Sequence, residues 1–97
     1  MRFFEKLVVI HTQSGFDNLM RAVRRAFIRE FRAYSGRPAP PEIQIVADAV
    51  SRLQSLENML QSAPIAVRQL KYNDYLQANQ DAQTKLWHWA QQNDPDL

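Results

Sequence analysis

The stretch GFDNLMRAVRRAFIREFRAY, residues 15–34, decides the fold class of this chain. Its large apolar side chains recur at steps of three and four residues: Phe16, Met20, Val23, Phe27, Phe31 and Tyr34. A helix with 3.6 residues per turn places these positions on one face, so we predict an amphipathic helix that packs this face against a core. Ser14 is expected to cap its start, and Ser35 and Gly36 to end it.

Two more helices are predicted around a proline-rich loop at residues 38–41, where the missing amide donors interrupt helix. The first spans 41–61, with Pro41 in its first turn, and its apolar face holds Ile43, Val46, Val50, Leu53, Leu56 and Leu60. The second spans 64–92, with an inner face of Tyr72, Tyr75, Asn79, Ala82, Leu86 and Trp89. Its middle, residues 77–85, is poorly hydrophobic, so this helix is expected to lie across the surface or to be completed by another subunit.

The two ends of the chain carry different patterns. Residues 2–12 have apolar positions at helical spacing, which favours a helix, but residues 7–10 (LVVI) could equally form a short buried strand, so the strand stays open as an alternative. The tail at residues 93–97 is expected to fray.

These elements predict an all-α protein with a single domain over residues 1–97, a small bundle of three to four helices. We expect it to be built on an antiparallel helical hairpin of residues 15–34 and 41–61. The helix at 64–92 would then cross this hairpin or extend from it.

Composition excludes several classes of function. The chain has no cysteine, which excludes disulfides and thiolate zinc sites and fits a cytoplasmic location. Its longest aliphatic run is four residues, too short for a membrane span, so no membrane association is expected. The two histidines, His11 and His88, have no second ligand at helical spacing, and no catalytic motif is present. We therefore expect neither an enzyme nor a cofactor.

Charge is unevenly distributed along the chain. Residues 1–37 hold eight Lys or Arg against three Asp or Glu, a net of +5, and the remainder nets −3 from four against seven. Arg21, Arg25, Arg29 and Arg32 fall within about an 80° sector of the first helix, opposite its aromatic face, and Arg24 flanks them. Together with Arg37 they are candidates for binding a nucleic-acid backbone or an acidic partner, because guanidinium pairs with phosphate and carboxylate oxygens. The alternative is an ordinary solvated face.

Three other residues are candidates for a protein interface. Ile28 is an apolar residue near the arginine sector, at a position where contact with solvent would be expected. Contact with a protein partner or with a neighbouring helix would account for an apolar side chain there. Trp87 and His88 are expected to turn away from the core and to offer an exposed aromatic anchor. The alternative for this pair is a core with one half-exposed tryptophan.

The sequence therefore predicts a non-catalytic helical binding module that acts as an accessory subunit of a larger assembly. A protein partner is expected, and nucleic acid is a candidate partner through phosphate contacts. The competing hypothesis is a pure protein-interaction or homo-oligomerising protein, such as an inhibitor that docks on a larger machine.

Overall fold

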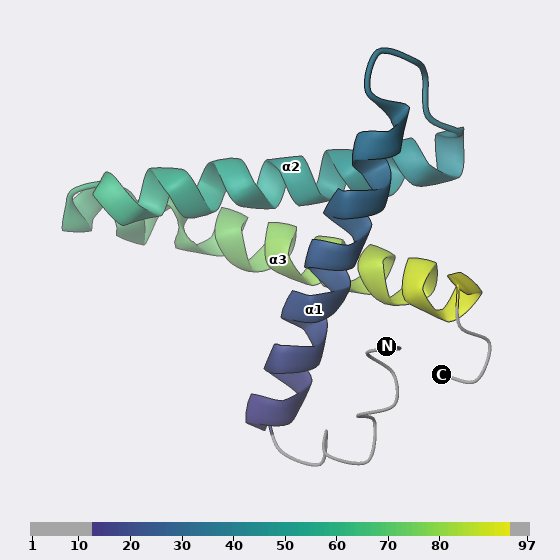
Figure 1. Ribbon diagram of the computed structural model, residues 1–97. Helices are drawn as coiled ribbons and strands as arrows, with labels where there is room; N and C mark the ends of the chain where they lie inside the picture. Colours follow the sequence, from purple (N-terminus) through teal and green to yellow (C-terminus); the bar gives the residue numbers. More distant parts are fainter. Residues whose placement is uncertain (1–12, 94–97) are drawn as a thin grey trace.

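The computed structural model describes residues 13–93, and these are helical almost throughout (Figure 1). The elements are α1 (Gln13–Phe31), the short 3-10 helix η2 (Arg32–Tyr34), α2 (Pro41–Ser62) and α3 (Ile65–Asn93). The all-α class is confirmed for this part of the chain. The choice between helix and strand at residues 2–12 lies outside the described residues, as does the tail beyond Asn93.

The predicted ends of the helices agree closely with the structure, except at the start of α1. Ser14 lies inside α1, so the prediction that it caps this helix is wrong: a capping residue has non-helical backbone angles, and Ser14 is helical. At the other end Gly36 adopts a φ of 79°, the left-handed conformation that ends the helical segment. α2 then begins at Pro41, and the Pro40 carbonyl accepts hydrogen bonds from the Ile43 and Gln44 amides at 3.0 and 2.9 Å.

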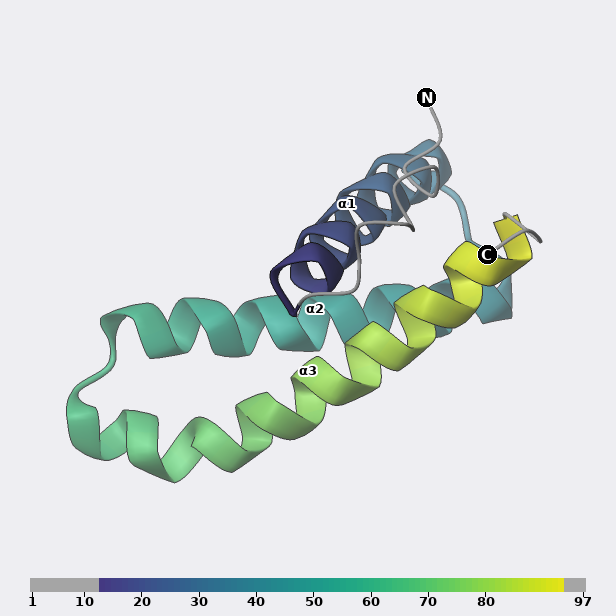
Figure 2. The same ribbon diagram turned by 90° about the horizontal axis from the view of Figure 1, so that it is seen from below.

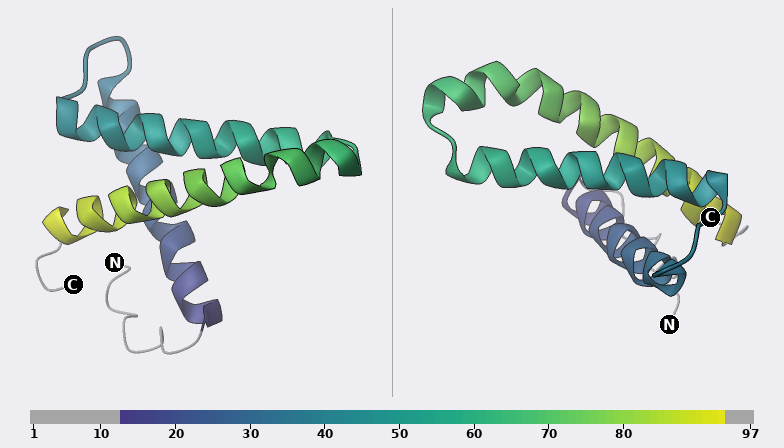
Figure 3. Two further views of the ribbon diagram at one scale, coloured as in Figure 1. Left: turned by 180° about the vertical axis from the view of Figure 1, so that it is seen from behind. Right: turned by 90° about the horizontal axis from the view of Figure 1, so that it is seen from above.

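The antiparallel hairpin is formed by α2 and α3, and not by α1 and α2 as the sequence predicted. α2 and α3 lie side by side, and α1 crosses them on one face (Figures 1 and 3). The reason is the length of the connections. Only residues 63–64 join α2 to α3, which forces them to be antiparallel neighbours, whereas the loop at residues 35–40 lets α1 leave α2 and cross. Arg68 secures the tight turn, because its Nε donates to the Ala63 carbonyl oxygen at 2.9 Å.

The helices enclose two adjoining apolar clusters. The first lies where α1 crosses the start of α2 and the end of α3. Figure 2 shows this crossing of the three helices from below. It contains Leu19, Met20, Val23, Phe27, Val46, Val50, Leu86, Trp89 and Ala90. The second lies between α2 and α3 alone and contains Ala49, Leu53, Leu56, Ala78 and Ala82. The half of the hairpin around residues 63–64 therefore projects beyond α1.

Two expectations about the last helix need correction. Its middle is not a surface segment, because Ala78 and Ala82 are 1% and 0% exposed and their small side chains let α3 approach α2 closely. Tyr72, expected on the inner face, is 54% exposed, since the projecting half of α3 has no α1 over it. None of the helices within residues 13–93 has the length and apolarity that a bilayer span requires.

Candidate polyanion-binding face

The outer side of α1 carries the arginines that the sequence singled out. Arg21, Arg25 and Arg29 are all exposed, and Arg32 follows them, also exposed, at the first position of η2. The buried side chains Val23 and Phe27 mark the opposite face of α1, against the hairpin. The amphipathic pattern of α1 is thus observed in the structure, and we call Arg21, Arg25, Arg29 and Arg32 the arginine face.

The four guanidinium groups of the arginine face have no partner within residues 13–93. The ion pairs in this part of the chain join Arg24 to Glu57, Lys71 to Asp74, and Lys85 to Asp81. Glu30 is near Arg29 and Arg32 in the sequence but forms no ion pair with either of them. The arginine face therefore presents its charge to solvent.

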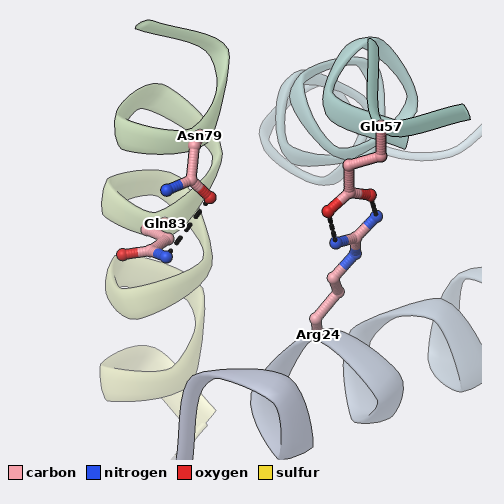
Figure 4. A network of polar contacts seen from close by, with 4 residues as sticks. All are labelled: Arg24, Glu57, Asn79 and Gln83. Carbon is pink, nitrogen blue, oxygen red and sulfur yellow. Dashed lines mark hydrogen bonds and ion pairs between the residues drawn. The ribbon is translucent and has the colours of Figure 1, made fainter. Parts of the chain in front are cut away.

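Arg24 is held by an internal contact and does not belong to the arginine face. Its Nη1 and Nη2 donate to the two carboxylate oxygens of Glu57 on α2, at 3.0 and 2.7 Å (Figure 4). The side chains are 23% and 35% exposed. Because Glu57 is distant in sequence, spacing on the first helix could not reveal this pair.

Arg37 is also separate from the arginine face. Its Nε and Nη2 donate to the Ala33 carbonyl oxygen at 3.2 and 3.0 Å, and its guanidinium lies 5.5 Å from the centre of the Tyr34 ring. It satisfies a carbonyl at the end of η2 and stacks on a neighbouring ring. The structure thus brings together four of the six predicted arginines.

The three predicted interface residues have different environments. Ile28 is half-buried and packs on the first apolar cluster, so a helical neighbour within the chain accounts for its apolar character. Trp87 does not turn away from the core. It is half-buried, and the centroid of its ring lies 6.2 Å from the centroid of the Phe16 ring. This is the half-exposed tryptophan of the alternative interpretation. His88 is exposed.

A polar crevice beside α1 was not foreseen from the sequence. Its polar lining residues are Asp17, Arg21, Arg24, Glu57, Tyr75, Asn79 and Gln83, and Met20, Leu53 and Leu86 complete it. Gln83 Nε2 donates to Asn79 Oδ1 at 3.3 Å across one turn of α3 (Figure 4). The sequence does carry one indication of this crevice. Two amide side chains four residues apart, Asn79 and Gln83, interrupt the apolar side of this helix. Within residues 13–93 no three His, Asp or Glu side chains gather as metal ligands.

Comparison of the chain with protein-family models, curated proteins and solved structures found no match.

Proposed function

We propose that this protein is a non-catalytic binding module, an accessory subunit of a larger assembly, whose arginine face contacts the phosphate backbone of a nucleic acid. One observation carries the proposal: four exposed arginines without an internal partner lie along one side of α1 and the first residue of η2, opposite the buried face of α1. Unpaired guanidinium groups in a row attract polyanions and release counterions on binding.

The dimensions of the arginine face suit a backbone contact. From Arg21 to Arg32 the helix rises about 16 Å, at 1.5 Å per residue. Duplex DNA carries roughly ten phosphates over that length, since it has one negative charge per about 1.7 Å of axis. Several arginines can therefore reach phosphates from one helix.

Base-specific recognition is less well supported by the structure. The rings of α1 face inward, as shown by Phe27, whose ring packs edge-on against that of Trp89 with centroids 5.2 Å apart. These rings offer no platform on which unpaired bases could stack. The loop at residues 35–40 between α1 and α2 also differs from the tight turn of a helix-turn-helix motif. Phosphate contacts, which position a protein without reading sequence, fit this surface better.

A salt titration of binding to duplex and single-stranded DNA tests the proposal. Four phosphate contacts on duplex give a slope of log affinity against log salt of about −3.6, at −0.9 per contact. The triple reversal R21E/R25E/R29E should abolish binding. The matched control is Arg52→Glu, which reverses an exposed arginine on α2 and should have a much smaller effect. A flat salt response, or equal losses in the triple variant and the control, contradicts the proposal.

An acidic protein is the competing ligand for the same arginines. Affinity purification with and without nuclease separates the two ligands, since only a complex held by nucleic acid is lost on digestion. A nuclease-resistant complex that R21E/R25E/R29E abolishes would assign the arginine face to a protein.

A second candidate function, association through protein contacts alone, is favoured by apolar side chains exposed on the projecting half of α3. Ile65, Leu70 and Tyr72 are 70%, 79% and 54% exposed.

A further inference from the structure

The projecting half of α3 carries a row of exposed side chains on one face. Ile65, Gln69, Tyr72 and Leu76 fall within about a 60° sector of the helix, at roughly 100° per residue. Ile65, Tyr72 and Leu76 remain 70%, 54% and 43% exposed, and Gln69 is exposed as well. We call these four residues the open stripe. Apolar side chains that align on one helix face are typical of a surface that another helix covers.

The open stripe continues a face that α1 covers further along the same helix. Trp87 falls in the same sector of α3, and its ring packs against Phe16 of α1. α1 crosses only the half of the hairpin that includes the end of α3, so the face is covered there and bare around residues 65–76 (Figures 1 and 3). The open stripe is therefore the uncovered part of a packing face.

No charged side chain of α3 lies within the sector of the open stripe. The charged residues of this helix are Arg68, Lys71, Asp74, Asp81 and Lys85, and all of them fall on other sides of it. A solvated helix face normally carries charge, whereas depletion of charge is characteristic of the centre of an interface.

We propose that a second copy of this chain covers the open stripe, with the two α3 helices packed antiparallel about a twofold axis. The axis passes between residues 70 and 71. Ile65 then lies opposite Leu76 of the partner subunit, and Gln69 lies opposite Tyr72 of the partner subunit. A twofold interface must be complementary to itself, and this pattern of residues meets that condition.

Two properties of the open stripe agree with a second copy as its partner: it carries no charge, and only a limited length of α3 is uncovered. A twofold axis brings each patch against its own equivalent, which is unfavourable for a charged patch, and the open stripe has no charge to repel its copy. α1 limits the overlap, because it already occupies the face around Trp87. The contact is thus confined to the projecting half of each helix. It is smaller than the roughly 800 Å² per partner of a standard interface, so we expect a weak, concentration-dependent dimer.

Sedimentation of the full chain over a range from low micromolar to near millimolar concentration tests this proposal without nucleic acid, and so independently of the arginine face. The mass should rise from monomer toward dimer. Leu76→Glu should raise the dimer dissociation constant at least about tenfold, because it places a carboxylate in an apolar contact. Leu70→Glu is the matched control: Leu70 is 79% exposed on the same helix but outside the sector, and its substitution should change nothing. A chain that stays monomeric throughout, or equal effects of the two substitutions, overturns the proposal.

The antiparallel register has its own test. Ile65→Lys alone and Leu76→Glu alone should each weaken the dimer. The double variant I65K/L76E should recover much of the affinity, because the two new charges of opposite sign face each other across the twofold axis. Circular dichroism checks that each variant keeps its helix content. A double variant that associates no better than the weaker single one overturns this register.

Discussion

Arg24 of α1 and Glu57 of α2 form a two-pronged ion pair, in which Nη1 donates to Oε2 at 3.0 Å and Nη2 donates to Oε1 at 2.7 Å. The pair is half-buried where α1 crosses the hairpin. It ties the crossing helix to its support by a directional contact, in addition to the apolar cluster beneath. It also divides the arginines of this part of the chain by role, since Arg24 contacts Glu57 within the fold while the arginine face remains open to solvent.

A double-mutant cycle on this pair should give a coupling energy of about 1 kcal/mol, at the upper end of the range for partly exposed pairs because the geometry is two-pronged. Urea unfolding of Arg24→Ala, Glu57→Ala and the double variant measures it. The coupling should shrink as salt is raised. Strictly additive effects of the two substitutions would show that the contact adds no stability.

Substituting Arg24 and substituting Arg25 should have different effects: the first should change the stability of the fold, and the second should change DNA binding. Arg25→Ala should reduce the magnitude of the salt slope of DNA binding by about one, the effect of one lost phosphate contact, and leave the midpoint of urea unfolding nearly unchanged. Arg24→Ala should lower the unfolding midpoint and leave the salt slope as it is. If Arg24→Ala changed the salt slope and Arg25→Ala did not, the binding surface would lie on the Arg24 side of α1.

Ala82→Leu should destabilise the protein by about 1–3 kcal/mol, because Ala82 is fully buried where α3 packs on α2 and replacing its methyl by an isobutyl group overpacks this contact. Thermal or urea unfolding measures the loss. Ala66→Leu serves as the control, since Ala66 is exposed on the same helix and the change should cost little. Similar stability of the two variants would mean that α2 and α3 are not closely packed at this point.

Gly36→Ala should cost about 1–2 kcal/mol of folding free energy, because a φ of 79° forces a side chain into the left-handed region. The space around Gly36 is open, with nothing within 4 Å of an added Cβ, so the cost comes from the backbone alone. Gly36→Asn should cost less, since asparagine tolerates this conformation better. Equal losses for alanine and asparagine would point to a cause other than backbone conformation.

Local chemistry was enough to predict where the helices of residues 13–93 run. The steps of three and four between apolar residues, the prolines at 38, 40, 41 and 64, and Gly36 act within a few residues of the chain, so their effect can be inferred without knowing the fold. The same periodicity predicted that arginines and aromatic rings occupy opposite sides of α1.

Only the tertiary structure decided which neighbouring helix, if any, packs against each helix face. Periodicity defines a face but does not say which neighbour covers it, so the hairpin partner of α2 and the exposure of Tyr72 were predicted incorrectly. Arg24, at the edge of the arginine sector, was predicted to bind the same ligand as its neighbours, but the structure places Glu57, far along the chain, beside it. Ala78 lies in the stretch that the sequence marked as poorly hydrophobic, yet it is 1% exposed in the apolar cluster between α2 and α3. Contacts between residues distant in sequence depend on how the whole chain packs, and no local pattern contains that information.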